Sequence, residues 1–126
     1  MDQYVPTNDL VMASETLPKK MIIRRRDAIE QLFQKGNKIS GRFTYLLYLP
    51  LDSSEGISMQ IGFMCGKKIG NAVTRNYYKR VLREVFRKNK SYFTGFQTLI
   101  IAQPSILKSD FFTLQEDIIV AGKKLK

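Results

Sequence analysis

The sequence predicts an α+β fold, in which helices cover a single β-sheet, because two kinds of segment follow one another along it. Apolar residues recur at helical spacing in residues 24–36 and 71–88, whereas aromatic and β-branched runs closed by proline occupy residues 41–50 and 94–104. The 126 residues suffice for one domain and are too few for two with separate cores. The expected order of elements is helix, three strands, helix, strand, helix.

The first helix is short and amphipathic, with the sequence RRRDAIEQLFQKG. Its apolar stripe consists of Ala28, Ile29, Leu32 and Phe33. Gly36 is expected to end it. Residues 1–18, which precede the helix, contain three acidic residues, no basic ones and no regular periodicity. We therefore predict a flexible acidic N-terminal extension over residues 1–18 and a single domain over residues 19–126.

The three strands expected next are NKIS (37–40), GRFTYLLYLP (41–50) and ISMQIGFMC (57–65). Alternation along the second strand gives two largely apolar faces, one formed by Phe43, Tyr45, Leu47 and Leu49 and the other by Thr44, Leu46 and Tyr48. One face of the third strand is expected to carry Met59, Ile61, Phe63 and Cys65. Because both faces of residues 41–50 are apolar, either both are covered or one forms a binding groove.

The last two elements are a buried strand and a helix. TGFQTLIIAQP predicts the strand, which ends at Pro104. SDFFTLQEDIIVAGKK predicts the helix, with Ser109 as its N-cap and Asp110 in its first turn.

The charge of the chain is large and unevenly distributed. Twenty-one basic and eleven acidic residues give a net charge of +10. Residues 67–90 hold nine basic residues and one acid, which places +8 in less than a fifth of the chain. A small domain with this excess typically binds a polyanion, and an evenly charged, merely solubilising surface is the alternative. The concentration of charge favours a docking face.

The composition also excludes several classes of function. Histidine is absent, which removes the commonest general base and the commonest metal ligand. The one cysteine, Cys65, cannot form an internal disulfide, as is usual in a reducing cytoplasm. The sequence contains no run of about 20 apolar residues, which is the length needed to span a bilayer. We therefore expect a cytoplasmic protein with no membrane partner.

A helix started near Asn71 divides into three sides at 100° per residue. The apolar side, expected to lie on the sheet, contains Tyr78, Val81, Leu82, Val85 and Phe86. An adjoining arc contains Arg75, Asn76, Lys79, Arg80, Arg83 and Arg87. Tyr77 and Glu84 fall on the third side, off this arc. Because Glu84 is the one acid available, we expect the cations of the arc to lack salt partners, which favours a phosphate backbone as their ligand.

The segment KKIGNAVTRNYYKRVLREVFR resembles the signature of the bacterial ribonuclease P protein subunit, a Lys-Lys turn followed by G-N-A-V-x-R-N-R-x-K-R-x-x-R-E-x-F. The resemblance extends over about residues 19–122 and includes LFQKG, RFTYLLY and LIIA followed by Pro104. It implies a mixed sheet with a left-handed βαβ crossover, similar to that of some ribosomal proteins.

The same resemblance implies a function. The chain would be the protein subunit of a ribonucleoprotein endoribonuclease, with the ribonuclease P RNA and precursor tRNA as partners and no obligate protein partner. The catalytic centre would lie in the RNA, which uses Mg²⁺ to remove the 5′ leader and give the mature tRNA 5′ end. No catalytic residue is expected in the protein, and no protein ligand of the metal is assigned.

The resemblance also assigns site residues. RNA contacts fall on Lys67, Lys68, Arg75, Asn76, Lys79, Arg80 and Arg83, to which the helical wheel adds Arg87. A groove for the leader would lie between the first helix and the sheet. It would use Ile29 and Phe33 with either Tyr45 and Leu47 or Leu46 and Tyr48, for all of which core packing is the alternative. Tyr77 stands where the family has arginine, so one RNA contact is lost or replaced by stacking.

Two other functions remain as alternatives. A non-enzymatic RNA-binding module, such as a ribosomal or assembly protein, would bind RNA with the same salt dependence and leave leader cleavage unchanged. Peripheral membrane attachment is disfavoured because the apolar side of residues 71–88 is expected to pack on the sheet.

Overall fold

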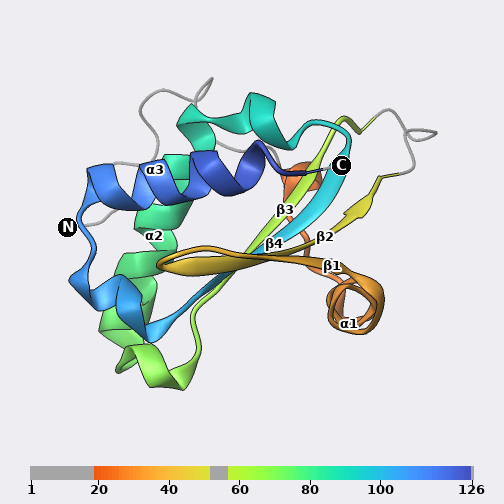
Figure 1. The fold of residues 1–126 in the computed structure, drawn as a ribbon. Coiled ribbons are helices and arrows are strands. Elements are labelled where there is room, and N and C mark those ends of the chain that lie inside the picture. The colour runs from red at the N-terminus through yellow and green to blue at the C-terminus, as the bar shows by residue number, and fades with distance from the viewer. Residues whose placement is uncertain (1–18, 52–56, 126) are drawn as a thin grey trace.

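The computed structural model describes residues 19–51 and 57–125, so the predicted extension at residues 1–18 lies outside the described residues. The elements follow one another in the predicted order (Figure 1): α1 (Arg26–Lys35), β1 (Asn37–Ser40), β2 (Thr44–Pro50), β3 (Gln60–Met64), α2 (Ala72–Lys88), β4 (Phe96–Ala102) and α3 (Phe111–Gly122). Short 3-10 helices precede α1, α2, β4 and α3. The α+β fold class is confirmed.

The four strands form one mixed sheet in the order β1-β2-β4-β3. β2 runs antiparallel to both β1 and β4, whereas β3 and β4 are parallel and are joined through α2 as a βαβ unit. The outer edge of β3 is partly covered by the residues just before α1, where Ile22 bridges Ile61 and the N–H of Ile23 donates to the carbonyl of Ile61 at 2.8 Å. This pairing protects part of an edge that would otherwise be open to another strand.

The sheet separates two apolar layers. On one face, α2 and α3 pack against the sheet in a core that includes Phe86, Leu114, Leu46, Ile61 and Ile100. On the other face, Leu32 of α1 packs in a smaller core with Ile23, Leu47, Leu99 and Ile101. Figure 1 shows α3 and α1 on opposite sides of the sheet. The helices are therefore divided two to one between the faces.

Phe43 does not share a face with Tyr45, so that part of the sequence prediction is wrong. β2 begins at Thr44, and Arg42 and Phe43 lie in a bend before it. Phe43 is buried in the core under α2 and α3. The alternation of the strand therefore starts one residue later than the pattern of apolar residues suggests.

Asp117 of α3 holds this bend in place. Its carboxylate accepts hydrogen bonds from the backbone N–H groups of Arg42 at 2.7 Å and Phe43 at 3.0 Å, and from the hydroxyl of Thr44 at 3.2 Å. A side chain at Gly41 would place its Cβ 2.6 Å from the same carboxylate. The turn between β1 and β2 is thus fixed by a polar residue of the last helix.

The N-cap of α3 is Asp110, not Ser109 as the sequence predicted. The Asp110 carboxylate accepts the N–H of Thr113 at 2.8 Å, and the Thr113 hydroxyl accepts the N–H of Asp110 at 3.0 Å, which forms a capping box. Hydrogen bonding by Thr113 to the carboxylate, chiefly from its backbone N–H, holds the pKa of Asp110 below its usual value. The Ser109 hydroxyl instead donates to the carbonyl of Ile106.

Gly36 follows α1 as predicted, but the conformation is extended, with φ −67°. Glycine is needed there for space, because a Cβ would lie 2.4 Å from the carbonyl oxygen of Leu32.

Across residues 19–51 and 57–125, no helix is both long and apolar enough to cross a membrane.

Candidate nucleic-acid interface

The turn that follows β3 exposes two lysines and is anchored by buried neighbours. Lys67 and Lys68 lie in the 3-10 helix Lys67–Ile69 and are both exposed, while Cys65 before them and Ile69 after them are buried in the core. Gly70 follows with φ 150°, a conformation that residues with a Cβ rarely adopt. The buried residues thus fix a turn whose two lysines point away from the core.

α2 starts next to this turn and packs as the helical wheel predicted. The side chain of Asn71 caps it by accepting the N–H of Thr74 at 3.0 Å. Leu82, Val85 and Phe86 are buried, and Tyr78 and Val81 pack against the same core. The apolar side is therefore confirmed, and it orients the rest of the helix toward solvent.

The predicted RNA contacts lie on one continuous surface that runs from the lysine turn along α2. We call this surface the basic face. It consists of Lys67, Lys68, Arg75, Asn76, Lys79, Arg80, Arg83 and Arg87. All are exposed except the half-buried Arg75 and Arg87. The prediction that these residues contact RNA is a matter for binding experiments, but their common placement on one surface follows from the fold.

The basic face adjoins the edge strand β3. The guanidinium of Arg83 lies 6.0 Å from the centroid of the Phe63 ring. Burial raises the pKa of the Cys65 thiol, and the nearby positive charges of Lys79 and Arg75 oppose that rise. Three cations of α2 therefore lie close to the end of β3 and to the lysine turn that follows it.

Glu84 was expected to lie off the arc and to leave its cations without salt partners. This expectation is wrong for Arg87, which pairs with Glu84. The guanidinium of Arg87 donates through Nε to Glu84 Oε2 at 3.0 Å, and a second bond joins Nη2 to Glu84 Oε1. Residues three apart on a helix are neighbours, and both side chains are long enough to meet between the arc and the third side. This pairing, with its hydrogen bond as the main cause, lowers the pKa of Glu84.

The other cations of the helix differ in their partners. In the part of the chain that the structure describes, no carboxylate pairs with Arg75, Lys79 or Arg83. Arg80 and Arg87 both have interactions within the chain. The Nε of Arg75 is buried and lacks a hydrogen-bond partner, so this guanidinium is partly desolvated. Arg75, Lys79 and Arg83 are thus the cations of α2 most available to an external anion.

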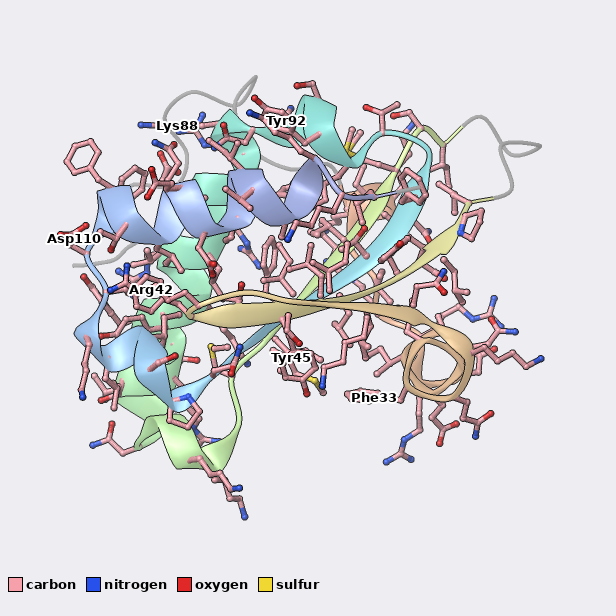
Figure 2. All side chains as sticks on the ribbon, in the orientation of Figure 1. Phe33, Arg42, Tyr45, Lys88, Tyr92 and Asp110 are labelled. Carbon is pink, nitrogen blue, oxygen red and sulfur yellow. The ribbon has the colours of Figure 1, made fainter. Side chains whose placement is uncertain are left out.

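A second candidate surface lies on the other side of the sheet, beside α1. Tyr45 and Leu47 are on this side, whereas Leu46 faces α2 and α3, which decides between the two registers left open by the sequence. Phe33 is 49% exposed, and Figure 2 shows its ring and that of Tyr45 on the α1 side of the sheet. We call Ile29, Phe33, Lys38 and Tyr45 the α1-side surface.

The four predicted groove residues are not equivalent. Leu47 is buried and packs in the core with Leu32, and Ile29 is half-buried against the same core. Phe33 and Tyr45 are therefore the two aromatic rings that a ligand could reach. Lys38 was missed by sequence reasoning, although its Nζ lies 4.6 Å from the centroid of the Tyr45 ring. The pairing of Lys38 with Leu47 across β1 and β2 brings it to this face.

The described residues contain no cluster of metal-ligating side chains. Among them, no three histidine, cysteine, aspartate or glutamate side chains come together to hold an ion. Mg²⁺ requires oxygen ligands, and the carboxylate of Asp117 already accepts two backbone N–H groups and one hydroxyl.

Comparison with known proteins agrees with the resemblance in the sequence. The family model described as Ribonuclease P matches residues 17–126. A ribonuclease P protein component of Citrifermentans bemidjiense is 33% identical over 115 residues, which cover 91% of this chain and 97% of the relative. One from Syntrophomonas wolfei is 35% identical over 111 residues, covering 86% and 89%.

Solved structures have the same fold. The RNase P protein of Thermotoga maritima superposes with a TM-score of 0.72 at 25% identity and covers 82% of this chain and 96% of its own. The RNase P protein of Staphylococcus aureus gives a TM-score of 0.66 at 26% identity, covering 87% and 98%. Because the family model spans nearly all of the described residues and the relatives are matched over most of their length, this chain belongs to the ribonuclease P protein family, whose general function is tRNA 5′ processing.

Proposed function

We propose that this chain binds the catalytic RNA of ribonuclease P and the 5′ leader of precursor tRNA, and promotes the Mg²⁺-dependent removal of that leader. The catalytic centre lies in the RNA partner, which also holds the metal, and the protein contributes no catalytic residue. It acts in the cytoplasm, without a membrane or an obligate protein partner.

The basic face is the observation that carries this proposal. Its cations begin at Lys67 and continue along α2, and Arg75, Lys79 and Arg83 have no carboxylate partner in the described ranges. Cations held close together repel one another, and a phosphate backbone reverses that repulsion and releases its own counterions. Arginine also binds phosphate through two parallel hydrogen bonds. These contacts explain why a protein without a catalytic group assists cleavage: it lowers the electrostatic cost of bringing two RNAs together.

The α1-side surface suits the single-stranded leader. Phe33 and Tyr45 offer aromatic rings on which unpaired bases stack with little sequence preference. Lys38, beside Tyr45, supplies a cation for the adjacent phosphate. The two surfaces approach each other near the end of β3, because Tyr45 pairs with Ile101 and Ile101 with Met64 across the sheet, and the lysine turn of the basic face follows Met64. One RNA strand can thus follow both.

The test is reconstitution. The chain is combined with a bacterial ribonuclease P RNA, and cleavage of precursor tRNA is measured at a low magnesium concentration. We expect cleavage to be faster than with the RNA alone, and the stimulation to be reduced by Arg83→Ala. RNA binding without any stimulation of cleavage would contradict the proposal and favour a non-enzymatic RNA-binding module.

A further inference from the structure

Two apolar side chains on α2 face solvent outside the core stripe. Val73 is 78% exposed and Tyr77 is 54% exposed. They are four residues apart and therefore lie next to each other on one side of the helix. Neither contributes to the two apolar cores, so their burial does not stabilise the fold.

The Tyr77 ring is nevertheless held in a defined position. It packs edge to face on Tyr78, with ring centroids 5.0 Å apart and an angle of 82° between the planes. Tyr78 is itself half-buried and packs against the core under α2. An ordered ring loses less conformational entropy on binding than a mobile one, which favours its use as a contact.

The charges around this pair decide which partner fits it. Asn76 and Arg80 flank Tyr77 along the helix, and the lysine turn at Lys67–Ile69 lies just before the first turn of α2. The acid on the same side, Glu84, is nearly two turns farther on and is paired with Arg87. A second copy of this chain, with a net charge of +10, would be repelled. An RNA offers both the negative charge and a flat apolar face.

We propose that Tyr77 stacks on an unpaired RNA base, with Val73 packing against the same nucleotide. This inference rests on the proposed RNA-binding function and adds a contact that distinguishes unpaired from paired RNA. The arginines and lysines of the basic face contact phosphates, which both forms of RNA possess, whereas a ring can stack only on a base that is not already stacked in a duplex.

The test compares Tyr77→Leu, which removes the aromatic face, with Tyr77→Phe, which keeps it. Binding is measured for a single-stranded oligouridylate of about 12 nucleotides and for an RNA duplex of the same length, across a range of salt concentrations. Phe112→Leu is the matched control, because Phe112 is an aromatic residue of α3 that is 77% exposed. Thermal unfolding monitored by circular dichroism verifies that all three variants are folded.

We expect Tyr77→Leu to weaken binding of the single strand by about fivefold or more, and Tyr77→Phe and Phe112→Leu to have little effect. The slope of log affinity against log salt should not change, because no phosphate contact is lost. Unchanged affinity for the single strand, an equal loss for the duplex, or a smaller slope would each overturn the inference.

Arg83→Ala separates this outcome from failure of the proposed function. If Arg83→Ala weakens RNA binding and Tyr77→Leu does not, the stacking contact is wrong and the proposed function stands. If the wild-type chain binds neither RNA, both are wrong. RNA carrying 5-iodouridine, whose photoreactive base couples to stacked aromatic rings, should give a cross-link at Tyr77 by mass spectrometry, and cross-links elsewhere only would contradict the proposal.

Discussion

α2 and α3 cover the same face of the sheet, yet they use their remaining residues differently. Both bury an apolar stripe in one core. α3 begins with a capping box and turns the carboxylate of Asp117 inward to hold the bend before β2. α2 places Arg75 near its positive end, against the helix dipole. α3 therefore stabilises the fold through polar contacts, whereas the cations of α2 carry an electrostatic cost that the proposed RNA ligand would offset.

The largest effect on stability is expected where an aromatic side chain of the two helices is buried in the core. Phe86→Ala in α2 should lower the free energy of unfolding by about 3–5 kcal/mol, because a fully buried ring is replaced by a cavity. Phe112→Ala in α3, at a ring that is 77% exposed, should change it by less than about 0.5 kcal/mol. Urea unfolding measures both, and similar losses would contradict the placement of these side chains.

A smaller effect is expected where α3 holds the bend. Asp117→Ala removes the acceptor of two backbone N–H groups and one hydroxyl, and should lower the free energy of unfolding by about 2–3 kcal/mol. RNA affinity of the folded variant should not change, because Asp117 lies outside the basic face. A loss of RNA binding in the folded variant would show that the division of roles between the helices is wrong.

The two arginines that end the basic face should differ. Arg83→Ala should weaken RNA binding and reduce the slope of log affinity against log salt by about 0.7–0.9, the value for one phosphate contact. Arg87→Ala should change the slope less, because Arg87 is already bound to Glu84. Filter binding or fluorescence anisotropy at several salt concentrations measures both slopes, and a larger change for Arg87 would contradict the structure.

The smallest effect is expected from the ion pair between Arg87 and Glu84, whose contribution to the free energy of unfolding depends on pH. Hydrogen bonding by Arg87 lowers the pKa of Glu84 in the folded chain, so this pair stabilises the fold above the unfolded pKa of about 4.3 and loses its contribution as the pH falls through the folded value. Glu84→Gln should therefore cost a few tenths of a kcal/mol at neutral pH, since the pair is partly exposed. The difference from wild type should vanish in acid. A difference that grows in acid would have the wrong sign.

Much of the fold could be predicted because its patterns are local. The stripe of α2 and the face shared by Met59, Ile61, Phe63 and Cys65 follow from helical and strand periods, and both are confirmed. Phe43 was misplaced because the bend before β2 depends on Asp117, 74 residues away in the sequence. Contacts of this kind leave no local signal.

The candidate site was predictable to a similar extent. Residue type and spacing locate the basic face, but the pairing of Arg87 with Glu84 depends on side-chain conformations that a wheel does not include. Ser109 was predicted as the cap, but Asp110 takes that position because Thr113, three residues after it, completes a capping box. The choice of Tyr45 over Leu46 required the position of α1, which packs on only one face of the sheet.

The most direct test of the central claim compares two triple variants of equal charge. One replaces Arg75, Lys79 and Arg83 of the basic face by alanine, and the other replaces Lys108, Lys123 and Lys124, which are exposed at the two ends of α3. The salt dependence of binding to ribonuclease P RNA is then measured for each. We predict that the slope of log affinity against log salt falls by about 2 for the α2 variant and changes little for the α3 variant. Equal changes in the two slopes would show that the RNA responds to net charge alone, and would contradict a specific role for the basic face.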